Sequence, residues 1–162
     1  MILPQSNTLE ISLKCECTGE ELFLRYAWPC ASDKLDSHKI SFSDFSTLKI
    51  LIEKGGIPKR ALLAVCFQNA VKAYGVYYRK SDRAIPEWSF DSVADYWRHH
   101  HIHPDKPHKC DLIKGIVRKI NGCIISVSVD EKMLPVKNIY NLPIQVGKTA
   151  YVHQHSVIEI MD

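Results

Sequence analysis

Apolar positions in the first hundred residues recur at intervals of three and four, the period of a helix that buries one face. Serine favours the position before a helix, proline its first turn, and glycine the position after its end. These signals predict helices from Gly19 to Trp28, from Ser41 or Ser43 to Gly55-Gly56, from Pro58 to about Tyr78, and from Ser89 into a histidine run. Before the first of these helices, only Leu9–Cys15 has a strand-like pattern.

Beyond Pro104 the pattern changes to alternation of apolar and polar residues, which is typical of half-buried strands. Asn121-Gly122 lies between the first two such segments and predicts a tight hairpin with a type I′ turn. The expected strands cover residues 113–120, 123–129, 133–138, 148–153 and 157–161.

The two patterns together predict an α+β protein of two parts. We expect a small, mainly helical N-terminal domain over residues 1–103, a linker at 104–109, and a small OB-like β-barrel over 110–162. A barrel is favoured over an open sheet because closure pairs the edges of short strands.

Composition narrows the class of protein. The chain has 162 residues, of which 46% are hydrophobic and 24% charged, as in ordinary globular proteins. Its net charge of +3 comes from basic residues spread along the chain, which argues against nucleic acid as a partner. With no secretory signal and no apolar run of membrane-spanning length, we predict a soluble, cytoplasmic protein with no membrane partner.

The sequence does not indicate an enzyme. It contains no glycine-rich phosphate loop, no nucleophile elbow and no paired-carboxylate motif. The six cysteines are irregularly spaced, and we expect reduced thiols, with Cys66 buried in an apolar helix.

Two short motifs in the last third of the chain each carry one metal-binding side chain. The first is Cys110-Asp-Leu-Ile-Lys-Gly115-Ile-Val117, and the second is Val146-Gly-Lys-Thr-Ala-Tyr-Val-His153. A thiolate and an imidazole brought together by a small barrel would suit a transition metal. We therefore take Cys110 and His153 as the leading candidate ligands.

These two motifs resemble the HypC/HupF family of nickel–iron hydrogenase maturation chaperones. That family opens with Cys-x-x-Ile-Pro-Gly-x-Val and closes with Val-Gly-x-x-Val-x-Val-His and an Ile-Asp ending. The residues of this chain that fall at matching intervals are Cys110, Ile113, Gly115 and Val117 in the first motif and Val146, Gly147, Val152 and His153 in the second, and the tail Ile158-Glu-Ile-Met-Asp162 ends much as the family's does. The chain differs in that 109 residues precede Cys110 and Lys114 replaces the proline. Residues 1–100 resemble no family that we recognise.

The resemblance implies a HypC-like barrel and a role in hydrogenase maturation. Family members carry an iron centre with cyanide and carbonyl ligands, act with a larger maturation partner protein, and deliver the iron to the hydrogenase large subunit. By this resemblance Cys110 would be the iron ligand and His153 its companion. The implied function is that of an accessory chaperone and not of an enzyme.

A histidine-rich segment before the first motif leaves two alternatives open. His101, His103 and His108, with Cys110, could bind Zn(II), Ni(II) or Fe(II), and His155 is a further candidate ligand. The histidines would equally suit a solvated helix end, where they meet the negative end of the helix dipole. The alternative functions are therefore a histidine-rich divalent-metal-binding protein, or a non-enzymatic module whose barrel binds protein or nucleic acid.

Overall fold

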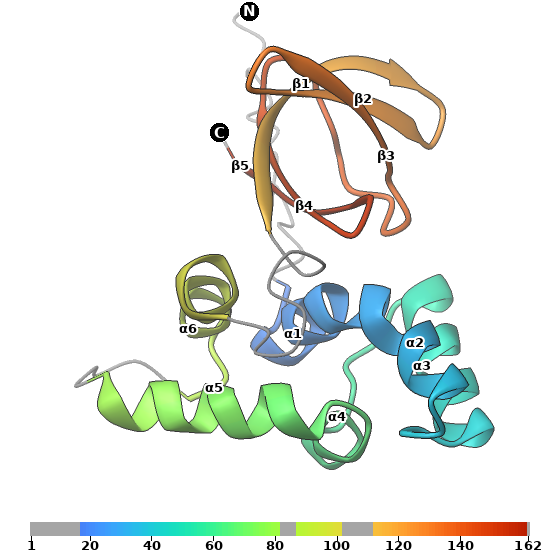
Figure 1. Ribbon diagram of the computed structural model, residues 1–162, viewed down its shortest axis with the longest axis vertical. Coiled ribbons are helices and arrows are strands. Elements are labelled where there is room, and N and C mark those ends of the chain that lie inside the picture. Colours follow the sequence, from blue (N-terminus) through green and yellow to red (C-terminus); the bar gives the residue numbers. More distant parts are fainter. Residues whose placement is uncertain (1–16, 82–86, 102–111, 162) are drawn as a thin grey trace, which may run out of the picture.

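The computed structural model describes residues 17–81, 87–101 and 112–161. A layer of helices lies beneath a closed β-barrel (Figure 1), so the chain has the α+β composition expected from its two patterns. The helical elements are α1 Gly19–Ala27, η1 Trp28–Cys30, α2 Ala31–Asp36, α3 Phe42–Lys54, α4 Arg60–Cys66, α5 Gln68–Lys80, α6 Phe90–Asp95 and η2 Tyr96–His100. The strands are β1 Ile113–Asn121, β2 Ile124–Val129, β3 Lys132–Lys137, β4 Thr149–His153 and β5 Ser156–Met161.

Three helices begin at a hydroxyl side chain that accepts a hydrogen bond from the first turn. Thr18 caps α1, Ser41 caps α3 and Ser89 caps α6, with amide-to-hydroxyl distances of 3.0 to 3.1 Å. Such caps satisfy amides that have no partner within the helix. The predicted caps at Ser41 and Ser89 are therefore confirmed, and α3 gives way to Gly55 with a φ of 72°, as expected.

The predicted third helix is wrong in one respect, because it divides into α4 and α5. The break falls at Phe67, whose φ of −124° and ψ of 47° leave the helical region. Phe67 is 1% exposed and belongs to the helical core, so a break there lets the two segments follow different directions around one buried ring. The short helix α2 after Pro29 was also not predicted.

Five strands close into a barrel in the order β1-β2-β3-β5-β4. Neighbouring strands are antiparallel except β3 and β5, which meet in parallel at Lys137 and Ser156. The predicted first hairpin is confirmed, but its turn is shifted by one residue. Asn121 pairs with Ile124, and Gly122 has a φ of 62°, so Gly122-Cys123 forms the turn with glycine first, as in a type II′ hairpin.

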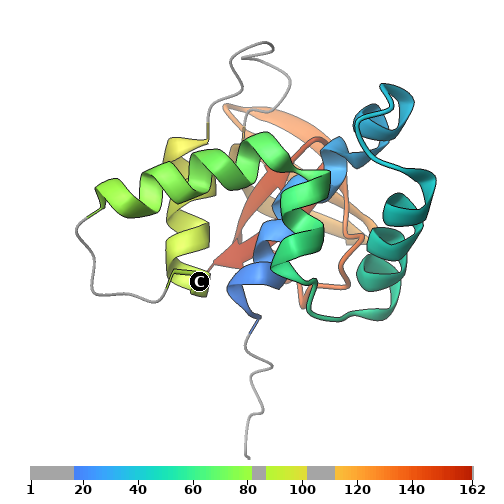
Figure 2. The ribbon, with the colours of Figure 1, turned by 90° about the horizontal axis from the view of Figure 1, so that it is seen from below.

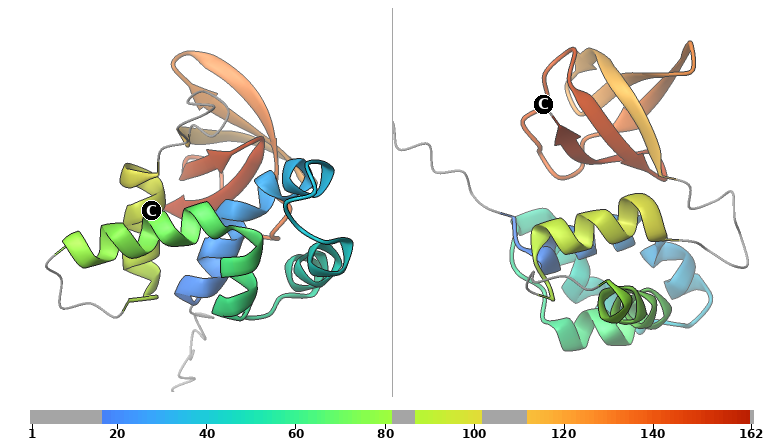
Figure 3. Two further views of the ribbon diagram at one scale, coloured as in Figure 1. Left: turned by 60° about the horizontal axis from the view of Figure 1, so that its bottom comes forward. Right: turned by 90° about the vertical axis from the view of Figure 1, so that its left-hand side faces the viewer.

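The barrel packs on the helical layer through β5, which is seen from below in Figure 2 and from the side in Figure 3. Ile158 of β5 is fully buried and belongs to the core cluster of the helices. The barrel interior is a separate cluster rich in valine, comprising Val117, Ile125, Val127, Val136, Ala150, Val152 and Val157. No helix in the described ranges is both long and apolar enough to span a membrane.

Candidate functional site

His153 lies at the junction of the barrel and the helices. It is the last residue of β4, and the turn Gln154-His155 that follows has positive φ at both positions, 45° and 66°. This is the backbone of a type I′ hairpin, which reverses the chain into β5. The His153 side chain is 1% exposed, so the histidine predicted as a ligand is buried at the base of the barrel.

One ring nitrogen of His153 is hydrogen-bonded and the other is not. Nδ1 lies 2.7 Å from the backbone carbonyl oxygen of Tyr26 in α1. A carbonyl can only accept, so Nδ1 carries the proton in the neutral ring and Nε2 has a free lone pair. Within the described part of the chain, Nε2 is buried and has no hydrogen-bond partner.

Burial also keeps the imidazole in its neutral form. Desolvation lowers the pKa of His153 from its ordinary value of 6.5, and the bond to the Tyr26 carbonyl opposes this only in part. A neutral imidazole is the form that binds metals. A hydrogen bond from Nδ1 to a backbone carbonyl is also the usual way in which a metal-binding histidine is oriented.

His153 lines a cavity of about 500 Å³ between the helices and the barrel. Trp97 of η2 lies beside it, with 6.2 Å between the two ring centres, and His101 packs on Trp97 at 4.1 Å. The indole Nε1 of Trp97 is a second buried polar atom for which the described residues provide no partner. The full lining is Tyr26, Trp97, Arg98, His99, His101, Leu112, Ile113, Lys114, Val129, Asp130 and His153.

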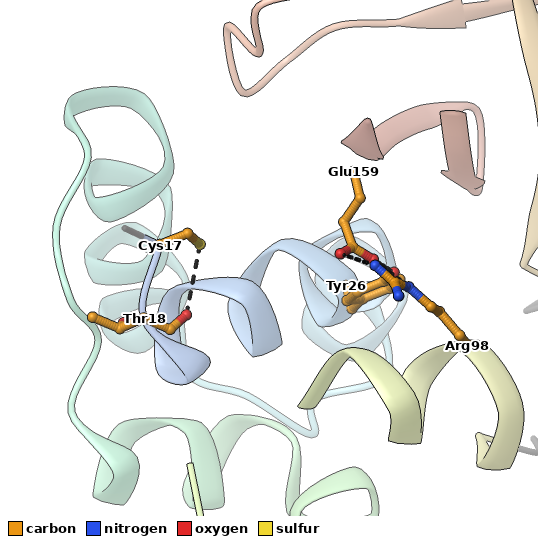
Figure 4. Close-up of polar contacts among 5 residues, drawn as sticks. All are labelled: Cys17, Thr18, Tyr26, Arg98 and Glu159. Carbon is orange, nitrogen blue, oxygen red and sulfur yellow. Dashed lines mark hydrogen bonds and ion pairs between the residues drawn. The ribbon is translucent and has the colours of Figure 1, made fainter. Parts of the chain in front are cut away.

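A buried ionic cluster holds the helices and the barrel together beside this cavity (Figure 4). Glu159 of β5 is 5% exposed and accepts two hydrogen bonds from Arg98, 2.6 Å from Nη2 to Oε1 and 3.1 Å from Nε to Oε2. The Tyr26 hydroxyl donates to the same carboxylate. Burial, followed by the Glu159 charge, raises the pKa of Tyr26, so its hydroxyl remains a donor.

Tyr26 connects this ionic cluster to the candidate site. Its carbonyl accepts from His153, its hydroxyl donates to Glu159, and its ring stacks on Trp97 with 5.4 Å between centres and 5° between planes. A change in the contact between α1 and β5 would therefore alter the surroundings of His153.

The other predicted site residues fall into three groups. His101 lines the same cavity as His153. His155 is exposed on the turn and lines a different cavity, with Trp28 and Phe45. The remaining candidates, Cys110, His103 and His108, lie outside the described residues, whereas the nearest described residues on either side, His101 and Leu112, both line the His153 cavity.

The described residues do not form a metal site by themselves. Across 17–81, 87–101 and 112–161, no three side chains of histidine, cysteine, aspartate or glutamate come together as a ligand group. The free lone pair of His153 nevertheless fits the role of a single ligand, which would need completion by other groups.

Two glycines of the family-like motifs have evident roles in building the barrel. A Cβ at Gly115 would come within 2.4 Å of the Val127 side chain and 2.8 Å of the Ser128 carbonyl oxygen, so only glycine lets β1 lie this close to β2. Gly147 has a φ of 90°, and its amide bonds to the Val117 carbonyl at 2.8 Å. Both positions serve the fold and do not by themselves indicate a function.

Four residues of the site were not predicted from the sequence: Trp97, Tyr26, Arg98 and Glu159. Glu159 gave the clearest signal, because it is the one charged residue within the apolar segment from Val157 to Met161. A charged side chain that is buried within an apolar strand is normally paired with a group of opposite charge. Its partner Arg98 is 61 positions away, so no local pattern could have identified the pair.

A comparison of this chain with family models, curated proteins and solved structures finds no match.

Proposed function

We propose that this protein is a non-enzymatic accessory chaperone of nickel–iron hydrogenase maturation, similar to the HypC/HupF family, that binds an iron centre as cargo. The observation that carries the proposal is the His153 imidazole, which is buried and neutral and has its Nε2 lone pair unpartnered among the described residues. The resemblance makes this same histidine the companion of the iron ligand Cys110.

The surroundings of His153 support a role in holding cargo. Its Nδ1 is fixed by the Tyr26 carbonyl, so Nε2 points in a defined direction with little rotational freedom to lose. Leu112, two positions after Cys110 in the sequence, lines the His153 cavity. The proposal makes the Cys110 thiolate the second ligand, with His101, which lines the same cavity, as a further candidate donor.

In this proposal the imidazole and the thiolate hold the cargo and transfer no protons. A thiolate is a soft, strongly donating ligand and imidazole is a common ligand of iron. The partners in the proposal are a maturation partner protein and the hydrogenase large subunit. Tyr26 and Glu159 would maintain the position of His153 between the helical layer and the barrel.

The direct test is complementation in a cell that makes nickel–iron hydrogenase and lacks this protein. His153→Asn removes Nε2, while the asparagine amide can still donate to the Tyr26 carbonyl near the position of Nδ1. We expect His153→Asn and Cys110→Ser each to abolish most of the hydrogenase activity that the unaltered protein restores.

His155→Asn is the matched control, because His155 is exposed two positions away and asparagine tolerates its positive φ of 66°. This control should restore activity fully. Full activity with His153→Asn and Cys110→Ser, at normal protein levels, would contradict the proposed function.

A further inference from the structure

The outer surface of β1, β2 and β3 is exposed to solvent. Successive residues of a strand point to opposite sides of a sheet, and the buried Val117, Ile125, Val127 and Val136 fill the barrel interior. The residues that alternate with them therefore point outwards. We call this outer surface the basic sheet face and define it by Ile116, Arg118, Lys119, Ile124, Met133 and Lys137.

The charges on this face have one sign. The three strands contain five lysine and arginine residues and no aspartate or glutamate. Arg118 lies at the bulge of β1, and its Nε donates a hydrogen bond to the neutral Ser128 hydroxyl at 2.9 Å. Among the described residues, none of Arg118, Lys119 and Lys137 is paired with a carboxylate. The face therefore presents positive charge that no carboxylate of its own neutralises.

Exposed apolar side chains lie beside these charges. Ile116 and Met133 are opposite Ser128 on its two sides, and they are 37% and 54% exposed. Neighbouring strands are about 4.8 Å apart, so Ile116 and Met133 lie about 10 Å apart across the small serine. The Arg118 side chain reaches into this interval, because its Nε is bonded to Ser128. A charged group and apolar groups are thus available to the same partner.

We propose that the basic sheet face binds an acidic segment of a partner protein that also carries apolar side chains. Carboxylates of that segment pair with Arg118, Lys119 and Lys137, and its apolar side chains cover the exposed isoleucines and Met133. A segment of this composition matches the face in charge and also removes its apolar area from water. Exposed pairs of this kind also set the rate and specificity of association.

A protein segment fits this face better than nucleic acid does. Single-stranded nucleic acid is held by stacking on aromatic side chains, and β1, β2 and β3 contain no phenylalanine, tyrosine or tryptophan. The inference does not rest on the proposed function, because no residue that defines the basic sheet face lines the cavity beside His153.

The test measures fluorescence anisotropy with the full chain, kept reduced, and a fluorescein-labelled peptide Glu-Leu-Asp-Glu-Leu-Asp-Glu. One control peptide replaces the acidic residues by glutamine and asparagine, and a second replaces the leucines by serine. We expect saturable binding of the first peptide that weakens with added salt, and weaker binding of both controls. No saturable binding of the first peptide, or equal binding of all three, would overturn the proposal.

Two matched double variants locate the binding surface. Arg118→Gln with Lys119→Gln should weaken peptide binding by about tenfold, since each exposed ion pair contributes up to about fivefold. Lys72→Gln with Arg79→Gln makes the same change in net charge at exposed positions of α5 and should leave binding unchanged. Equal binding by the two folded double variants would show that net charge alone attracts the peptide, and would overturn the proposal.

The remaining measurements address the apolar contacts and the alternative partners. Met133→Gln should weaken binding by about fivefold, because it removes an apolar side chain that the peptide covers. His153→Asn should bind the peptide as the unaltered protein does, so this test stands apart from that of the proposed function. Tighter binding of single-stranded DNA or of phosphatidylserine vesicles than of the peptide, lost in Arg118→Gln with Lys119→Gln, would overturn the assignment to a protein partner.

Discussion

The contact between the helices and the barrel depends on Glu159, and Glu159→Gln tests this dependence. The substitution keeps the shape of the side chain but removes its charge, leaving Arg98 without its anion. The Arg98 and Glu159 side chains are only 18% and 5% exposed, so Arg98 can regain little hydration. Removing one partner of a buried ion pair costs about 3–5 kcal/mol, and the hydrogen bonds that glutamine can still make should reduce this to about 3 kcal/mol.

In a protein of this length that loss corresponds to a decrease in Tm of about 6–12 °C, measured by circular dichroism with urea unfolding as the second assay. Glu53→Gln is the control, because Glu53 and its partner Lys49 are both 57% exposed and such a pair contributes at most about 1 kcal/mol. If Glu159→Gln changed stability by no more than Glu53→Gln, the ionic cluster would not hold the two layers together.

Three further predictions concern pH, packing and thiol reactivity. Because the pKa of His153 in the folded state lies below 6.5, the unfolded state binds a proton below that pH that the folded state does not bind. The free energy of unfolding should therefore decrease as pH falls below about 6.5, by up to about 1.4 kcal/mol per pH unit from this residue. His153→Asn should remove that part of the pH dependence, measured by urea titrations at several pH values. Gly115→Ala should destabilise the fold by about 1–3 kcal/mol in the same assay, since its Cβ would overlap Val127; an unchanged unfolding midpoint would refute this. Burial raises the pKa of Cys17 to about 12 and of Cys66 to about 11, so iodoacetamide at pH 8 should modify the exposed Cys123 before these two thiols in peptide mass spectra, and equal rates at the three thiols would contradict this.

Local signals in the sequence were sufficient for most of the secondary structure. Ser41 and Ser89 mark helix starts because a hydroxyl satisfies amides within the same turn, and the alternation after Pro104 reports burial on one face of each strand. The break at Phe67 was not predicted, because it depends on how one ring packs in the helical core and not on local preference.

The candidate site was predicted only in part for a related reason. His153 was predicted as a site residue because it ends the second motif. The burial of His153 follows from its position at the end of an apolar strand. The groups that contact its side chain are distant in the sequence. The carbonyl of Tyr26, which accepts its hydrogen bond, is 127 positions away, and Trp97 belongs to the helical element η2. Only the packing of the helices on the barrel brings these groups together.

The proposed binding of metal by His153 Nε2 is tested most directly by the iron content of the protein after oxygen-free purification from hydrogenase-producing cells with its maturation partner. We predict iron in the unaltered protein and in His155→Asn, infrared bands of bound cyanide and carbonyl, and loss of both signals in His153→Asn. Equal iron content in the unaltered protein and in folded His153→Asn, or no iron in either, would contradict it.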